Sequence, residues 1–323
     1  MLVLVTGASG FLGSHVASQL VQEGHCVRVF MRSSSAKAPA GCEVVFGDLS
    51  DSDSLGRATN GAEVVYHCAA LVSDWGPLSS FRAVNRDGVK TLLEACAASR
   101  VRRFVQVSTL DVLGWRNRML LEEAEPVHTG FAYPDTKGEG ETLVKQLAPA
   151  SNIEYSIIRP GWIYGPGDRQ FLPEIVDALR KGNALLIALG RRPAPVVFIE
   201  NLVPALVQAG QNENASGKCF HLVDDPVPTW AEFFNRIARR IGVATPTFSL
   251  SPDLAYICAA VLESWAKVTR QKTRPLLTRY IVRYWSSDFE VETARARADL
   301  GFRTAISLEE GLQRTLSPAG YLS

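Results

Sequence analysis

The chain has 323 residues, of which 21% are charged, and its formal net charge is +1. Nucleic-acid-binding proteins concentrate basic residues, and no such block occurs, so we expect no nucleic acid partner. The longest strongly apolar stretch, 254–262, is shorter than the roughly 20 residues that a membrane-spanning helix needs. The first residues form an apolar strand pattern with no basic leader segment, and we therefore expect a cytoplasmic protein. The cysteines and histidines lack the spacing of metal ligands, so no metal site is expected.

Short β-branched runs alternate with helical patterns through the first half of the chain. Strands are expected at 2–5, 27–31, 43–46, 63–67, 103–107 and 154–158, and helices at 11–23, 87–99 and 133–147. Leu12, Val16 and Leu20 form one apolar stripe on the first helix, which suits packing on a sheet. This alternation predicts an α/β fold, a Rossmann-type doubly wound parallel sheet with right-handed crossovers.

The second half of the chain is less regular, because prolines divide it into short pieces after about residue 165. We expect residues 1–165 to form the Rossmann-type domain, with return elements at about 196–224. Within that segment, strands at 196–199 and 219–223 are expected to rejoin the sheet. Segments 166–195 and 225–323 then form a smaller, mostly helical C-terminal substrate-binding region, placed over the carboxyl ends of the strands.

A glycine-rich segment lies between the first expected strand and the first expected helix. Glycines at these positions allow a tight turn and a close approach of the backbone to a pyrophosphate, while the helix N-terminus offers free N–H groups. The segment predicts a dinucleotide cofactor. The residues expected to contact it here are Gly7, Ser9, Gly10, Phe11, Leu12 and Gly13.

The second strand indicates which dinucleotide is used. NAD-specific sites place a carboxylate at the end of this strand for the ribose 2′-hydroxyl, but this chain has Arg32 there. A guanidinium can pair with a 2′-phosphate, so NADP (NADPH) is preferred and NAD stays possible; a solvated Arg32 is the alternative. Asp48, followed by Leu49, can accept from the adenine amino group. Ala69 and Ala70 are small and let the cofactor approach the end of the fourth strand.

Tyr133 and Lys137 are four residues apart and share one face of an expected helix. A free tyrosine has a pKa of about 10, so it serves as an acid and base near neutrality only if a nearby cation favours phenolate. Lys137 is expected to supply that cation and to hold the nicotinamide ribose. Thr109 follows the fifth strand and can orient the substrate oxygen. For Ser108 we expect a structural role, in which its hydroxyl satisfies a backbone group.

Together these features resemble the extended short-chain dehydrogenase/reductase family, the NAD-dependent epimerase/dehydratase superfamily. The resemblance covers about the first 170 residues. It is carried by the glycine segment, Asp48-Leu49, Ala69-Ala70, Asn85, Thr109, Tyr133, Lys137 and Arg159-Pro160.

The resemblance implies roles for individual residues. Thr109, Tyr133 and Lys137 are implied as a catalytic triad, with Asn85 as an accessory residue of the site. Pro160 and Gly161 are implied to lie against the nicotinamide. A homodimer through the helices at 85–99 and 133–147 is also implied.

Departures from the sugar-modifying members of that family point to one branch. Trp162 replaces an asparagine that contacts the nucleotide diphosphate in sugar epimerases, and Leu110-Asp111 lacks the first acid of the pair found in sugar dehydratases. The sequence is therefore similar to the 3β-hydroxysteroid dehydrogenase branch, which implies a small hydrophobic ketone or alcohol substrate, steroid- or sterol-like or a long-chain β-keto acid. Two alternatives stay open: a nucleotide-sugar epimerase or dehydratase with tightly bound NAD, and a protein that binds NADPH without catalysis.

Several apolar residues are candidates for the substrate cavity, with core packing as the alternative. These are Asp74-Trp75-Gly76, Trp115 and Trp162. Segment 250–284 carries enough apolar residues to form a lid, to make peripheral membrane contact, or to complete the core. Basic residues flank it and either stay solvated or meet a substrate carboxylate: Lys267, Arg270, Lys272 and Arg274.

Overall fold

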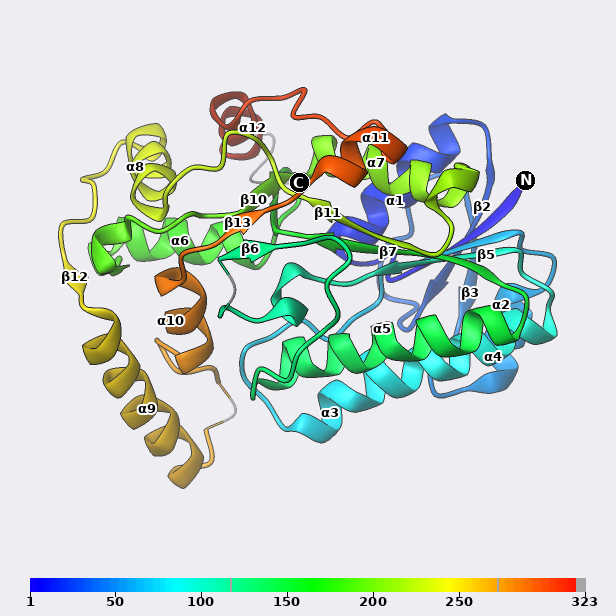
Figure 1. Ribbon diagram of the computed structural model, residues 1–323, viewed down its shortest axis with the longest axis horizontal. Helices are drawn as coiled ribbons and strands as arrows, with labels where there is room; N and C mark the ends of the chain where they lie inside the picture. Colours follow the sequence, from blue (N-terminus) through cyan, green and yellow to red (C-terminus); the bar gives the residue numbers. More distant parts are fainter. Residues whose placement is uncertain (117, 272, 318–323) are drawn as a thin grey trace.

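The computed structural model describes residues 1–116, 118–271 and 273–317, so Lys272 and the last part of the expected substrate-binding region lie outside the described residues. The chain builds a seven-stranded parallel sheet in the order β11-β7-β5-β4-β1-β2-β3 (Figure 1). Its strands are β1 (Leu2–Thr6), β2 (Cys26–Met31), β3 (Cys42–Phe46), β4 (Val64–His67), β5 (Arg103–Val107), β7 (Glu154–Pro160) and β11 (Lys218–Leu222).

Helices cover both faces of this sheet (Figure 1). One face carries α1 (Phe11–Gln22), α7 (Ile199–Gln211) and α11 (Ala294–Leu300), and the other carries α2 (Ser52–Thr59), α4 (Gly88–Ala98) and α5 (Ala132–Ala150). The apolar stripe of α1 is used as expected, since Val16 and Leu20 are fully buried and Leu12 packs against the same core. Because both faces are covered, the central strands β1 and β4 are almost entirely buried. The predicted Rossmann-type fold is confirmed.

The order of the strands reverses beside β1, which pairs with β2 on one side and β4 on the other. In doubly wound sheets, ligands bind in the crevice outside the carboxyl ends of the strands at this switch point. The loops that follow β1 and β4 therefore flank the crevice, and these loops contain the glycine segment and Ala69-Ala70.

Only one of the two expected return strands joins the main sheet. β11 pairs with β7 at the sheet edge, in agreement with the expected strand at 219–223. The prediction for 196–199 is wrong, because β10 (Val196–Phe198) pairs with β8 (Trp162–Tyr164) in a separate two-stranded sheet. The outer edge of β7 is already occupied by β11. The chain leaves the main sheet after Pro160, so β8 and its partner β10 both lie outside that sheet.

Most of the remaining elements gather at the end of the sheet opposite the N-terminus (Figure 1). They are α6 (Phe171–Arg180), α8 (Trp230–Ile241), α9 (Pro252–Val268), α10 (Arg279–Ser286) and α12 (Leu308–Thr315), with short strand pairs β6 (Met119–Leu120) with β13 (Glu290–Val291) and β9 (Leu186–Ile187) with β12 (Ser249–Leu250). Within the described ranges, no helix combines the length and apolarity needed to cross a membrane.

Candidate active site

The glycine segment after β1 forms a tight loop whose shape depends on missing side chains. Gly7 has a φ of +72°, and a Cβ there would lie 2.7 Å from the backbone nitrogen of Ala69. A Cβ on Gly13 would lie 2.4 Å from the carbonyl oxygen of Gly7. Gly10 begins α1 without a side-chain cap, and Ser9 and Gly10 are exposed. The first N–H groups of α1 are therefore available to an anionic ligand such as a pyrophosphate.

Two charged side chains lie beyond the ends of β2 and β3, on the side of the crevice expected for the adenosine. Arg32 is exposed and lies near enough to Asp48 to help lower the pKa of that carboxyl. The main cause of the lowered pKa is hydrogen bonding from Ser50, whose backbone N–H and hydroxyl donate to Asp48 Oδ1 at 3.0 and 2.7 Å. Asp48 is thus an ionised acceptor, while Leu49 is partly buried against the α2–α4 side of the core.

Asn85 joins the loop after β4 to helix α5. It lies in a π-helical turn, Ala83–Asp87, between α3 (Leu78–Arg82) and α4. Its amide accepts from Leu71 N at 2.8 Å and donates to Leu71 O and to Thr136 Oγ1 at 3.1 and 3.2 Å. Asn85 therefore fixes the position of the loop that carries Ala69 and Ala70 relative to α5, rather than contacting the expected catalytic side chains.

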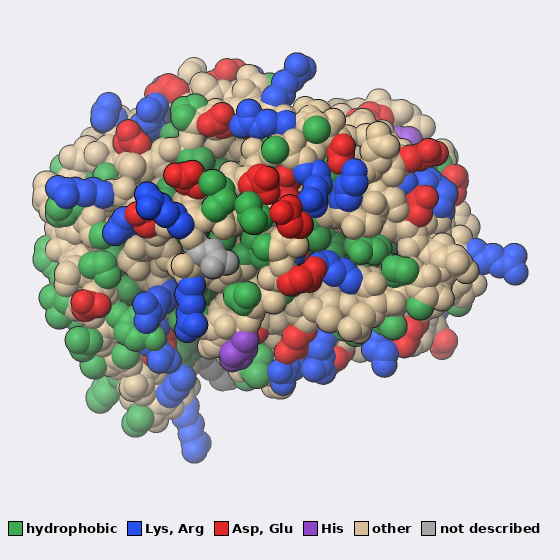
Figure 2. Space-filling model, viewed as in Figure 1, with side chains coloured by type: hydrophobic (Ala, Val, Ile, Leu, Met, Phe, Trp, Pro, Cys, Tyr) green, Lys and Arg blue, Asp and Glu red, His purple; other side chains and the backbone are tan. Residues whose placement is uncertain are grey.

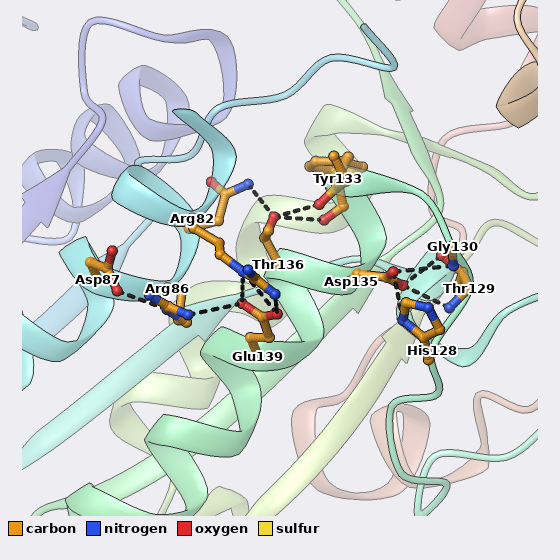
Figure 3. A network of polar contacts seen from close by, with 12 residues as sticks. Arg82, Arg86, Asp87, His128, Thr129, Gly130, Tyr133, Asp135, Thr136 and Glu139 are labelled. Atoms are coloured by element: carbon orange, nitrogen blue, oxygen red, sulfur yellow. Dashed lines mark hydrogen bonds and ion pairs between the residues drawn. The ribbon is translucent and has the colours of Figure 1, made fainter. Parts of the chain in front are cut away.

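The start of α5 is held from two sides (Figure 3). The Asp135 carboxylate accepts from Thr129 N and Thr129 Oγ1, both at 2.7 Å, and from Gly130 N at 3.1 Å. One turn further along, Glu139 forms an ion pair with Arg82 of α3 at 2.7 Å. These contacts lie between and beside positions 133 and 137, so they fix the helical turn that presents both expected catalytic residues.

The structure brings Thr109, Tyr133 and Lys137 together. The Thr109 hydroxyl lies close enough to the Tyr133 phenol to act on its pKa. Lys137 is buried, and its ammonium donates to the carbonyl oxygen of Val107 at 2.5 Å, at the end of β5. Burial lowers the pKa of Lys137 to about 8. Phenol, hydroxyl and amine therefore converge at the carboxyl end of β5.

The pKa of Tyr133 moves opposite to the expectation. It is raised well above its ordinary value, first by burial and then by the negative charge of Asp111; only the Thr109 hydroxyl acts to lower it. Lys137 does not produce the expected lowering, because its ammonium is directed to the Val107 carbonyl. Tyr133 is thus held as a protonated phenol near neutral pH.

Asp111 and Tyr280 belong to the same site and were not identified as site residues from the sequence. Asp111 is buried, and the Tyr280 hydroxyl of α10 donates to its Oδ2. Burial raises the pKa of Asp111 from 3.8 to about 6, although hydrogen bonds with Tyr280 and Thr109 offset part of the effect. Its position two residues after Thr109 was visible in the sequence. The partner, 169 residues further along the chain, was not.

A second buried ion pair lies one helical turn beyond Lys137. Glu141 of α5 and Arg159 of β7 are both fully buried, with Arg159 Nη2 and Glu141 Oε2 2.6 Å apart. Arg159 Nη1 also donates to Ala124 O at 2.9 Å. Arg159 was noted only as part of the family pattern. The structure shows that Arg159 joins α5 to β7 of the sheet, one helical turn after Lys137.

An aromatic wall stands beside these polar groups. Tyr284 of α10 packs against Trp115 and Trp162, with ring centroids 6.4 and 5.2 Å apart. Trp115 also packs edge-on against Tyr280 at 5.7 Å. Two of the expected cavity residues, Trp115 and Trp162, are therefore brought together by α10 beside the Asp111–Tyr280 pair.

The segment between β7 and β8 approaches other backbone so closely that only glycine fits. Pro160 ends β7, and a Cβ on Gly161 would lie 2.1 Å from the carbonyl oxygen of Pro195. Both residues are buried. This packing places Trp162 at the start of β8.

Other expectations are corrected. The Ser108 hydroxyl is buried but has no hydrogen-bond partner within the described part of the chain, so it does not satisfy a backbone group. Asp74 and Trp75 lie against segment 267–278: Asp74 pairs with Arg274 at 2.6 Å, and Lys267 lies 6.0 Å from the Trp75 ring centroid. Arg274 also pairs with Glu174, so it is neither merely solvated nor free for a substrate carboxylate.

Comparison with known proteins agrees with this architecture. Residues 3–222 match the model of the NAD dependent epimerase/dehydratase family. The chain belongs to this family. It is therefore an NAD-dependent oxidoreductase acting on CH–OH groups, and the glycine loop and the residues near β2 and β3 fit the dinucleotide that such an enzyme uses. Within the described residues, no group of three or more His, Cys, Asp or Glu side chains could hold a metal ion.

Relatives and solved structures differ in the chemistry their names state. A 2-alkyl-3-oxoalkanoate reductase of Shewanella oneidensis is 27% identical over 96% of this chain and 84% of its own length. The sterol-4-alpha-carboxylate 3-dehydrogenase, decarboxylating, of Mus musculus is 28% identical over 98% of this chain and 91% of its own. The structure of MoeE5 in complex with UDP-glucuronic acid and NAD matches with a TM-score of 0.77 at 22% identity, covering 97% of each chain, and shows the shared fold.

Proposed function

We propose that this protein interconverts a ketone and a secondary alcohol on a hydrophobic substrate, steroid- or sterol-like or a long-chain β-keto acid. The observation that carries the proposal is that Thr109, Tyr133 and Lys137 lie together at the carboxyl end of β5, beside an aromatic wall. An apolar carbon skeleton fits such a wall, whereas a nucleotide diphosphate needs polar or charged partners. The names of the two relatives, a ketoreductase and a sterol dehydrogenase, support the same substrate class.

The residues that would hold the cofactor surround the crevice beside β1. We propose that NADP is preferred over NAD, because Arg32 is exposed at the end of β2 and no acid takes the place of the 2′-hydroxyl acceptor. The full set is Gly7, Ser9, Gly10, Phe11, Leu12, Gly13, Arg32, Asp48, Leu49, Ala69, Ala70, Tyr133, Lys137, Pro160 and Gly161.

The chemistry divides between cofactor and protein. When bound, a nicotinamide dinucleotide supplies or accepts a hydride at the substrate carbon. In reduction, the Tyr133 phenol gives its proton to the carbonyl oxygen while Thr109 holds that oxygen in place. Asp111 acts on the proton-transfer group, because its negative charge raises the pKa of the phenol. Lys137 would hold the nicotinamide ribose, and Asn85 keeps the loop and α5 in register.

Tyr133→Phe tests the proposal. The variant should keep NADPH affinity within about twofold of the wild type but lose several orders of magnitude in NADPH oxidation with steroid, β-keto acid and aromatic ketones, since a proton donor contributes about 10²–10⁴-fold. Tyr155→Phe, far from the site on β7, is the control and should keep full activity. Unchanged turnover in Tyr133→Phe would remove the mechanism.

The main alternative is a nucleotide-sugar epimerase or dehydratase, and it has a distinct signature. Such an enzyme retains NAD through turnover, so protein purified with one NAD per chain and inactive on every ketone would favour it. For the assembly, we propose a homodimer through α4 and α5, which sedimentation equilibrium would detect.

A further inference from the structure

Helix α9 has an unusual distribution of side chains. The residues it buries are small or polar: Ala255, Ala259, Glu263 and Ala266. Ala255 and Ala259 pack on α10, and the Glu263 carboxylate accepts from Arg279 N at 2.7 Å. Helices that merely cap a core bury their large apolar side chains and expose the small ones. α9 does the reverse.

The large apolar side chains of α9 form a row on the opposite face, here called the α9 outer face: Leu254, Ile257, Val261, Trp265 and Val268. Their spacing of three or four residues places them in one line about 20 Å long. Ile257, Val261 and Trp265 are 60%, 63% and 64% exposed, and Val268 is 80% exposed. Two further exposed apolar side chains, Phe248 and Leu276, precede and follow the helix in the sequence.

This concentration sets α9 apart from the rest of the surface. Elsewhere in the described residues, exposed large apolar side chains are separated along the chain, as on most monomers. A continuous exposed apolar row marks a surface that another apolar phase or partner covers. Figure 1 shows α9 on the outer edge of the molecule, with α10 on its inner side, so the row is open to a large, flat partner.

The charges around the row indicate what that partner is. The stretch from 264 to 276 contains basic residues and no acidic one. Lys267 and Arg270 are exposed at the same end of α9 as Trp265 and Val268. Figure 2 shows Lys and Arg side chains beside hydrophobic ones in this region, at the lower left. An indole within an apolar row with cations at its rim suits the interface of an anionic membrane.

We propose that the α9 outer face docks the protein on an anionic lipid bilayer. With 17 residues, α9 is too short to span a bilayer comfortably, so it lies in the plane of the interface with its apolar row in the acyl boundary. The inference goes beyond the proposed function and does not depend on it, because docking needs no turnover. It gives the enzyme a place where lipid-like molecules are concentrated.

Flotation with vesicles tests the docking. The full-length protein should float with phosphatidylcholine vesicles containing 30% phosphatidylglycerol and less strongly with pure phosphatidylcholine, and Trp265 fluorescence should shift to the blue, a shift lost in Trp265→Phe. Val261→Glu should weaken binding at least about tenfold, since it places a charge in the apolar row that would enter the bilayer. Lys267→Gln should reduce the excess binding to anionic vesicles about fivefold.

The control adds the same charge at another exposed apolar position. Phe46→Glu, on β3, should bind vesicles like the wild type, and thermal melting should show that all variants fold. Absence of wild-type binding to anionic vesicles overturns the proposal, as does equal binding by Val261→Glu. The proposal is also overturned if the wild type forms a concentration-dependent dimer that Val261→Glu abolishes, and if neither the wild type nor the variant binds vesicles. The α9 outer face would then be an interface between two copies of the chain.

Discussion

Asp111→Asn removes a buried negative charge from the centre of the site, and its effect on stability depends on pH. The pKa of Asp111 is about 6 in the folded protein, against 3.8 ordinarily. Between these pH values the folded state binds the Asp111 proton more tightly than the unfolded state does. The free energy of unfolding of the wild type therefore falls as the pH rises. The shift corresponds to about 3 kcal/mol at pH values above 6, because one pKa unit is worth about 1.4 kcal/mol.

The Asp111→Asn variant has no carboxyl to ionise at this position, so it does not lose this stability as the pH rises. The difference between variant and wild type therefore reports the ionisation of Asp111. The difference in melting temperature, variant minus wild type, should rise by about 4 °C between pH 4 and pH 7.5, given about 2.1 cal/mol/K of unfolding entropy per residue in a chain of this length. Buried His67 and His221, whose pKa values are lowered to about 3, destabilise both proteins equally at low pH and cancel in the difference.

Differential scanning calorimetry from pH 4 to pH 8 measures this difference. Asp48→Asn is the matched control, because the pKa of Asp48 is lowered and its removal should produce no rise of that kind. A flat difference across the range, or one that falls with pH, would show that Asp111 is not a high-pKa acid and would refute the account of the site. Because the charge also raises the pKa of Tyr133, the pH profile of alcohol oxidation by Asp111→Asn should move to lower pH.

Two further substitutions test other parts of the structure. Arg32→Ala should raise the KM for NADPH about tenfold or more and leave the KM for NADH nearly unchanged, since charge-assisted hydrogen bonds contribute about 1.5–3 kcal/mol. Steady-state kinetics with both cofactors measures this, and Lys37→Ala is the control. Equal effects on both cofactors would contradict the proposed preference for NADP. Glu141→Gln should lower the stability by about 3–5 kcal/mol, because it leaves Arg159 buried without its counter-charge. Glu139→Gln, which breaks the partly exposed pair with Arg82, should cost about 1 kcal/mol or less in the same denaturant titration; similar losses in the two variants would contradict the account of the buried pair.

The nucleotide-binding half was predictable because its signals are local. The glycine segment, the apolar stripe of α1 and the Tyr133–Lys137 spacing each lie within a single turn or helix, where periodicity alone fixes which side chains share a face. The strands of the main sheet up to β7 followed for the same reason, whereas the short β6 was not predicted. The parallel, doubly wound arrangement came from the alternation of strands and helices and the crossover rule rather than from any one residue.

The remainder depends on contacts that sequence spacing does not encode. The Tyr280–Asp111 hydrogen bond and the Arg159–Glu141 pair join elements whose distance depends on the whole fold. The pKa of Tyr133 was mispredicted because the direction of the Lys137 ammonium is set by a carbonyl at the end of β5. The apolar content of segment 250–284 was visible in the sequence. Its exposure was not, since a row of large side chains does not reveal which face of a helix packs inward.

The fit of Gly13 against the Gly7 carbonyl has a consequence for how ligand capture proceeds. The turn after β1 takes its shape from α1, which packs behind it. The space between Gly13 and the Gly7 carbonyl is too small for any side chain. Its N–H groups are thus aligned by packing within the protein itself, and little ordering entropy remains to be lost when a pyrophosphate arrives. Association at this turn should therefore resemble binding to a rigid receptor, fast and weakly temperature-dependent.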